Sequence, residues 1–102
     1  MTLITPSPLG SSPPESRRFS QQEIVVGRGN GLDWTLPDPE KNLSRRHFVI
    51  RLTGGKYQIE DISTNGVILN DSIELQLHQP VALSSGDRLK LSHAYRVNAH
   101  TH

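Results

Sequence analysis

Short apolar runs rich in β-branched residues recur along this chain, and most of them stop at a turn signal that contains glycine. The runs cover residues 23–26, 47–52, 57–62, 67–69, 73–77, 81–83, 88–91 and 94–97. No window keeps a helical period, while Gly54-Gly55 and Asn65-Gly66 are tight-turn signals of the kind that join strands. Many short strands with regular turns predict an all-β, antiparallel sandwich or barrel.

The length of 102 residues corresponds to one domain. Only 33% of the residues are apolar, which indicates that part of the chain lies outside the core. The proline- and serine-rich segment 6–16 is the candidate for such a tail. We therefore predict an N-terminal strand and flexible segment over residues 1–17, the folded domain over 18–98, and a C-terminal tail over 99–102.

Charge and cysteine content exclude several classes of function. Eleven basic and ten acidic residues give a net charge of +1, far from the basic character of a nucleic-acid-binding domain. The chain has no cysteine, so disulfides and thiolate metal sites are excluded. We find no apolar stretch of membrane-spanning length, and the first residues do not resemble a secretory signal. The expected location is the cytoplasm.

Three short motifs at the ends of predicted strands combine glycine or hydroxyl residues with charged or amide side chains. They are Gly27-Arg28, Ser44-Arg45-Arg46-His47 and Ser63-Thr64-Asn65-Gly66. The planar fork of arginine suits phosphate oxygens, and hydroxyl and loop N–H groups add further donors. Asn65 has both a donor and an acceptor, so it suits the main chain of an extended peptide. If the fold gathers the three motifs at one end, they form an anion site.

Each motif also has an ordinary structural explanation. An arginine after a strand is usually just solvated, and Ser44 suits a turn cap. His47 at a strand start suits a hydrogen-bonded structural role, and Asn65-Gly66 meets the needs of turn geometry. The order and spacing of the three motifs, taken together, favour a functional explanation.

The three motifs resemble those of the forkhead-associated (FHA) domain, over residues 24–97. The Gly-Arg, Ser-x-x-His and Ser-x-Asn-Gly motifs of that family match residues 27–28, 44–47 and 63–66, and Asp61, Asn70 and Gly86-Asp87 also fit. The resemblance implies a two-sheet antiparallel β-sandwich that binds phosphothreonine peptides with loops at one end, without catalysis or a cofactor. The implied peptide contacts are Arg28, Ser44, Arg45, Thr64 and Asn65, and the implied structural supports are Gly27, His47 and Gly66.

The loop before Ser44 resembles the loop of one particular group of FHA domains. Residues 32–39 and 43–47 are similar to FHA modules attached to bacterial type VI secretion systems. That similarity implies a module of a longer chain, with a threonine-phosphorylated kinase or secretion-system component as its partner. A tight connector before Ser63 and a valine at position 67 depart from the family pattern without removing a phosphate donor. A second hypothesis places Thr2 and Thr5 on a mobile tail that, once phosphorylated, occupies the site of its own or of a neighbouring molecule.

Three alternatives stay open. A phosphate-independent interaction or scaffold domain would use a sheet face or edge of the same sandwich. A hydrolase triad of Ser44, His47 and Asp61 would lack the Gly-x-Ser-x-Gly turn that presents such a serine. Metal binding by three histidines near the C-terminus would lack a carboxylate or cysteine at ligand spacing. These histidines are His93, His100 and His102.

Overall fold

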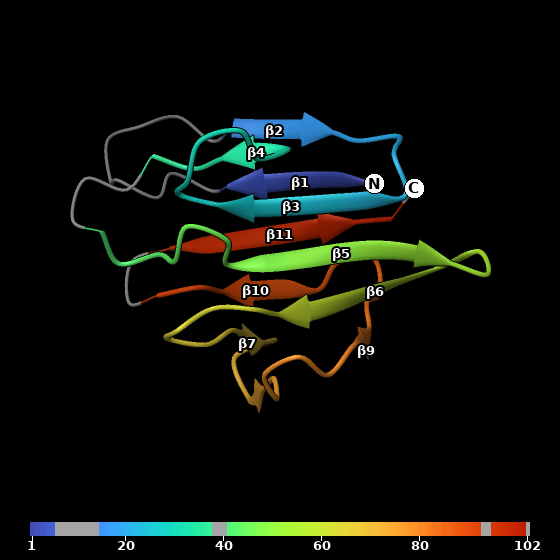
Figure 1. The fold of residues 1–102 in the computed structure, drawn as a ribbon. Coiled ribbons are helices and arrows are strands. Elements are labelled where there is room, and N and C mark those ends of the chain that lie inside the picture. The colour runs from blue at the N-terminus through green and yellow to red at the C-terminus, as the bar shows by residue number, and fades with distance from the viewer. Residues whose placement is uncertain (6–14, 38–40, 93–94, 102) are drawn as a thin grey trace.

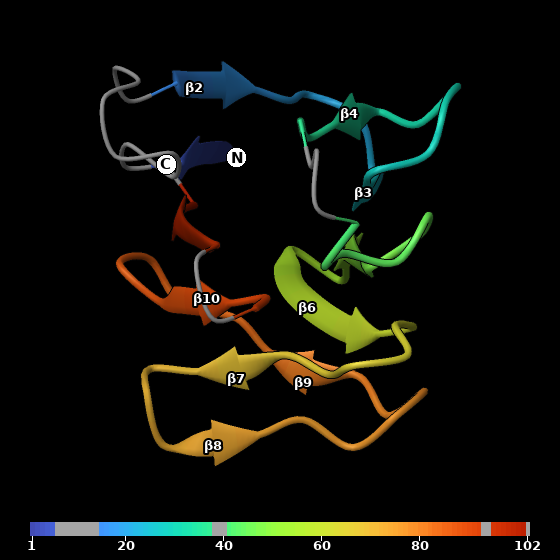
Figure 2. The ribbon, with the colours of Figure 1, turned by 90° about the vertical axis from the view of Figure 1, so that its left-hand side faces the viewer.

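The structure is a computed structural model that describes residues 1–5, 15–37, 41–92 and 95–101. These residues form eleven strands in two sheets that lie face to face (Figures 1 and 2). Within these ranges there is no helix long and apolar enough to cross a membrane. The prediction of an all-β, mostly antiparallel sandwich is confirmed, and two separate sheets replace the barrel alternative.

Six strands form the first sheet, and each neighbouring pair in it is antiparallel. In spatial order they are β2 (Glu15–Arg18), β1 (Thr2–Thr5), β11 (Arg96–His100), β10 (Arg88–Lys90), β7 (Ile68–Leu69) and β8 (Ile73–Glu74). The second sheet contains β4 (Trp34–Thr35), β3 (Glu23–Gly27), β5 (Phe48–Thr53), β6 (Lys56–Asp61) and β9 (Val81–Ala82). Among these eleven strands only β3 and β4 run parallel to each other.

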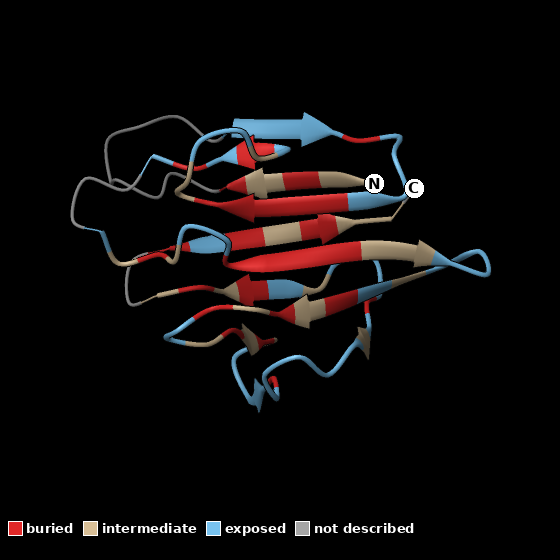
Figure 3. Ribbon diagram, in the orientation of Figure 1, coloured by how far each residue is buried: buried red, intermediate tan, exposed pale blue. Residues whose placement is uncertain are grey.

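Inward-facing side chains of both sheets build the core, visible as the red segments of the strands in Figure 3. In the second sheet, Ile24, Ile50 and Ile59 lie in one cross-strand row and are fully buried. The fully buried apolar positions of the first sheet are Leu3, Leu89, Val97 and Ala99. Burial of one such aliphatic side chain contributes about 1.5–3 kcal/mol, so these rows hold the two sheets together.

The prediction of a half-buried strand over residues 73–77 is wrong for most of that segment. Only the two residues of β8 pair with β7, and the side chains of Ile73 and Leu77 are 51% and 54% exposed. The chain then crosses to the second sheet, where Leu77 bridges Asp61. His78 follows with a φ of 63° and donates its N–H to the Asp61 carbonyl. The alternating pattern thus belongs mainly to a connection between the sheets.

The N-terminal residues form part of the first sheet, where β1 pairs with β11 of the predicted domain. Leu3 pairs with Ala99, and both side chains are fully buried. Thr5 is 3% exposed and donates its hydroxyl hydrogen to the Glu15 carbonyl at 3.2 Å. The hypothesis that Thr2 and Thr5 lie on a mobile tail is therefore wrong, because both belong to β1. Residues 6–14 lie outside the described residues.

The last strand differs from its prediction in a related way. β11 runs to His100, beyond the expected end at residue 97. It extends further because β1 pairs along it, with Thr2 opposite His100. The predicted tail over residues 99–102 therefore begins inside this strand, and its first residue, Ala99, belongs to the core.

The direction of the strands places the three motifs together. The left end of the sandwich in Figure 1 is where β3 and β6 end and where β5 and β7 begin. Figure 2 shows this end facing the viewer. Met1 and the end of β11 lie at the opposite end. We call the end formed by residues 28–33, 41–47 and 62–67 the loop end.

Candidate functional site

The first motif lies where β3 meets the loop that precedes β5. The N–H groups of Arg28 and Gly29 donate to the carbonyls of Ser44 and Arg45, at 3.1 and 3.0 Å. A Cβ atom on Gly27 would lie 2.2 Å from the Arg45 carbonyl oxygen, closer than the two atoms can approach. Glycine at position 27 is therefore required for these two loops to lie backbone to backbone.

Gly29 is a structural residue that the sequence prediction missed. A Cβ atom there would lie 3.0 Å from the same Arg45 oxygen. The Gly29 carbonyl also accepts a hydrogen bond from the Thr35 hydroxyl at 2.6 Å, which ties the turn to β4. The signal was present in the sequence, because glycine stands on both sides of Arg28.

Arg28 is half-buried and crosses to the loop at residues 41–47. Its Nε donates to the Leu43 carbonyl at 2.7 Å. This bond fixes the guanidinium plane and leaves the two terminal nitrogens without a hydrogen-bond partner among residues that the structure describes. A guanidinium held by one nitrogen presents the others in a fixed direction, which suits binding of an oxyanion.

His47 connects the second motif with the third from a fully buried position. The Ser44 N–H donates to His47 Nδ1 at 3.1 Å, so the ring proton lies on Nε2, which donates to the Gly66 carbonyl at 3.0 Å. Ser44 Oγ accepts the Thr64 N–H at 2.9 Å, and its own hydrogen points to no described acceptor. The imidazole thus positions two loops, and the Ser44 hydroxyl donates to no acceptor in the described part of the chain.

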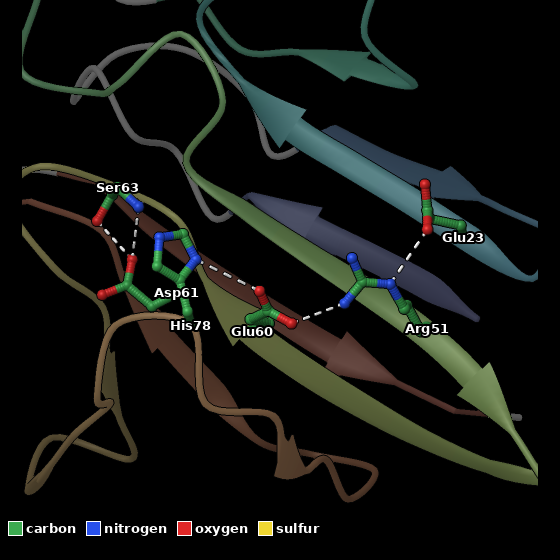
Figure 4. Close-up of polar contacts among 6 residues, drawn as sticks. All are labelled: Glu23, Arg51, Glu60, Asp61, Ser63 and His78. Carbon is green, nitrogen blue, oxygen red and sulfur yellow. Dashed lines mark hydrogen bonds and ion pairs between the residues drawn. The ribbon is translucent and has the colours of Figure 1, made fainter.

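The same hydrogen bonds argue against the hydrolase alternative. Ser44 meets the His47 ring through its backbone N–H and not through Oγ. Asp61 accepts hydrogen bonds from the N–H and the hydroxyl of Ser63, at 2.8 and 2.5 Å, as Figure 4 shows. Ser44, His47 and Asp61 therefore do not form a nucleophile–base–acid arrangement.

The third motif is a closed turn with an exposed apex. Ser63 Oγ accepts the Gly66 N–H at 2.7 Å, and Gly66 has a φ of 96°, which disfavours a side chain. Thr64 and Asn65 at the apex are exposed. Asn65 Nδ2 donates to the Asn42 carbonyl at 3.3 Å, which turns the amide towards the neighbouring loop. This bond fixes the orientation of the side-chain amide at the apex.

The structure brings all of the predicted site residues to the loop end. The predicted contacts Arg28, Ser44, Arg45, Thr64 and Asn65 line its surface as half-buried or exposed residues. Gly27 and His47 are buried between the loops, and Gly66 closes the turn. The role of each residue in binding stays a prediction.

A separate network of polar side chains lies on the outer face of the second sheet (Figure 4). Arg51 binds Glu60 at 2.8 Å and Glu23 at 3.1 Å, and His78 Nδ1 lies 3.5 Å from the other Glu60 oxygen. The hydrogen bond to Glu60, followed by that to Glu23, raises the pKa of Arg51. None of these residues belongs to the three motifs, so this network supports the sheet and not the site.

The structure gives no support to the metal alternative in the part of the chain that it describes. No group of three or more histidine and carboxylate side chains capable of holding a metal occurs there. His100 lies in β11, while His93 and His102 lie outside the described residues.

Comparison with protein families identifies the fold family. Residues 24–92 match the model of the FHA domain. The chain belongs to the FHA family. Among solved structures, the FhaA FHA domain, crystallised in complex with the intracellular domain of Rv3910, is 30% identical with a TM-score of 0.75. That similarity covers 95% of this FHA domain chain and 96% of the other.

Further solved FHA domains show the same fold. One comes from a structural and functional analysis of phosphothreonine-dependent FHA domain interactions. It is 30% identical with a TM-score of 0.69, and the similarity covers 99% of this chain and 97% of that chain. The N-terminal FHA domain of S. cerevisiae Rad53p, in complex with a phosphothreonine peptide, is 22% identical with a TM-score of 0.74, over 97% and 92%. The search of curated protein sequences gave no match.

Proposed function

We propose that this FHA domain binds a segment of a partner protein that carries phosphothreonine, and that it catalyses no reaction. The proposal rests on one observation: hydrogen bonds between loops hold the Arg28 guanidinium and the Ser44 hydroxyl at the same end of the sandwich. Both side chains keep donor hydrogens for a ligand. Family membership supports this ligand, because a 30% identical FHA domain was studied for phosphothreonine-dependent interactions.

The phosphate group fits the donors at the loop end. It carries about −1.5 to −2 charges near pH 7 and has three acceptor oxygens. The terminal nitrogens of Arg28 and the hydroxyl of Ser44 donate to these oxygens, and the exposed Arg45 adds a second positive charge. Thr64 and Asn65, at the apex of the neighbouring turn, bind the peptide main chain. Little reorganisation is needed, because backbone hydrogen bonds already fix the loops.

Calorimetric titration with one peptide in phosphorylated and unphosphorylated forms tests the proposal. We expect binding of the phosphorylated form only, and a loss of at least about tenfold in affinity for Arg28→Ala, since a hydrogen bond to a charged group contributes about 1.5–3 kcal/mol. Lys56→Ala, at the opposite end of the sandwich, is the control with the same change of charge (Figure 1). Equal binding of both peptides would instead indicate a phosphate-independent interaction domain.

The partner class in the proposal is a threonine-phosphorylated kinase or component of a type VI secretion system in the bacterial cytoplasm. The support for this class is the similarity of residues 32–39 and 43–47 to FHA modules of such systems. Capture of proteins from extracts of the cells that produce this domain, with the wild-type and the Arg28→Ala domain as bait, tests this partner class. We expect a secretion-system protein that only the wild-type domain retains and that phosphatase treatment releases. Phosphatase-sensitive capture of unrelated proteins alone would contradict this class of partner.

A further inference from the structure

A surface hollow of about 800 Å³ lies at the loop end beside Arg28. Its walls are the turn at residues 29–33 and the side chains of Arg28, Arg45 and Arg46. Arg46 lies one position beyond the predicted contacts and has no role in the proposed binding of phosphothreonine. Three arginines therefore line one hollow, and Arg46 is the one among them that has no proposed ligand.

The charge of these arginines is not neutralised within the described part of the chain. Arg45 and Arg46 are exposed and form no ion pair there. By contrast, Arg88 and Arg96 on the first sheet both pair with Asp71, at 3.0 and 3.3 Å. Arg88 and Arg96 thus have a carboxylate partner away from the hollow, whereas Arg45 and Arg46, which line it, have none among the described residues.

One carboxylate, that of Asp33, also lines the hollow. Its Oδ2 accepts the Val25 N–H at 2.7 Å, and its Oδ1 accepts a hydrogen from Gln21 Nε2 at 3.2 Å. These bonds stabilise the carboxylate and hold the turn after β3 in place. Asp33 therefore serves the wall of the hollow, and three positive charges face one negative charge.

We propose that this hollow binds a second anionic group of the same partner segment, with Arg46 as a contact. The inference rests on the proposed function, because the phosphothreonine beside Ser44 would anchor the segment. An extended peptide advances about 3.3–3.6 Å per residue, so an anion a few residues from the phosphothreonine reaches the hollow. The domain then prefers segments that carry two nearby negative groups.

A phosphate and a carboxylate share the chemistry that this hollow recognises. Both offer oxygen acceptors that match a guanidinium fork. The phosphate has the larger charge and more acceptor oxygens, so it should bind more tightly than a glutamate side chain at the same position. A second phosphorylated residue and an acidic flank are thus the two possible sources, and peptides distinguish them.

Titration with three matched peptides tests this inference. Each contains one phosphothreonine. The first kind has only neutral flanking residues, the second has one glutamate, and the third has one phosphoserine. The glutamate or phosphoserine is moved through each flanking position in turn. We expect the phosphoserine peptide to bind about fivefold more tightly than the neutral one at low salt. This factor corresponds to the upper end of the free energy that an exposed ion pair contributes. The glutamate peptide should show a smaller gain, and both gains should shrink in high salt.

The ratio of affinities for the doubly and singly charged peptides is the decisive measurement. Arg46→Gln should reduce this ratio to about one, while Lys56→Gln, with the same change of charge at the opposite end of the sandwich, should keep it. Equal affinities for all three peptides, or a gain that survives in Arg46→Gln, would overturn this inference and leave the proposed function intact. No binding of any phosphorylated peptide would overturn the proposed function itself.

Discussion

At the scale of single residues, the loop end depends on groups that bring backbones together. Gly27 permits the contact between β3 and the loop that precedes β5, since a side chain there would overlap the Arg45 carbonyl. His47 uses both ring nitrogens on backbone groups, one at Ser44 in its own loop and one at Gly66 in the neighbouring turn. Gly27 and His47 are buried, whereas the predicted contacts Arg28 and Ser44 also reach the surface, so substitutions should separate stability from binding.

Gly27→Ala should lower the free energy of unfolding by about 3 kcal/mol or more, the upper end of the cost of overpacking, because the new Cβ would lie 2.2 Å from a backbone oxygen. Gly31→Ala is the matched control. Its φ of 75° costs about 1–2 kcal/mol for an L residue, but no atom lies within 4 Å of the new Cβ. Urea unfolding measures both, and an equal or smaller loss for Gly27→Ala would contradict the close approach.

Ser44→Ala and His47→Ala should differ in what they lose. Ser44→Ala removes a donor to phosphate, so affinity should fall about tenfold, while stability falls by less than about 1 kcal/mol because water can bind the exposed Thr64 N–H. His47→Ala leaves two half-buried backbone groups without this partner, the Ser44 N–H and the Gly66 carbonyl, at up to about 1–3 kcal/mol each. Unfolding and titration on both variants check this, and a Ser44→Ala domain with full affinity would contradict the assigned contact.

At the scale of elements, the sequence predicts some strands much better than others. β3, β5 and β6 are long, pair in sequence order or nearly so, and bury β-branched residues. All four residues of β2 are exposed, and β4 has only two residues, so neither has a pattern to detect. The pairing of β1 with β11 joins the two ends of the chain, which no local pattern can indicate.

The site was predictable to a similar, partial degree. The motifs in the sequence single out Arg28, Ser44 and Asn65, which lie at the loop end, and their binding of a ligand stays a prediction. The acceptors that orient two of them are the backbone carbonyls of Leu43 and Asn42. A carbonyl is the same in every residue, so only the fold can show which one is used.

Leu3→Ala should show that β1 belongs to the domain. The Leu3 side chain is fully buried opposite Ala99, so its truncation should cost about 2–5 kcal/mol. Ile73→Ala is the control, because that side chain is 51% exposed in β8 and its loss should change stability by about 0.5 kcal/mol or less. Thermal or urea unfolding measures both. If Leu3→Ala proved as harmless as Ile73→Ala, β1 would not be part of the cooperative fold.

At the scale of the whole molecule, a net charge of +1 hides an uneven arrangement of charge. On the sheet faces, Arg51, Arg88 and Arg96 each pair with a carboxylate. At the loop end, Arg45 and Arg46 form no such pair among the described residues. The paired arginines should therefore affect stability, and the unpaired ones should affect binding of anions.

Arg51→Gln tests the stabilising half of this division. Arg51 is 42% exposed, so its two ion pairs should contribute only about 0.5–1 kcal/mol, and less at about 1 M salt, where charges are screened. Because the pKa of Arg51 is raised, its guanidinium stays charged at any pH below its ordinary value, so deprotonation of Arg51 removes this contribution only in strong alkali.

The stability difference between wild type and Arg51→Gln should therefore stay constant from about pH 6 to pH 9. Urea unfolding across this range and at two salt concentrations measures it, and Lys56→Gln controls for the change in net charge. The same Arg51→Gln domain should keep its phosphopeptide affinity, because Arg51 lies on the sheet face and not at the loop end. A loss of affinity without a loss of stability would mean that the charges of the sheet face and of the site act together.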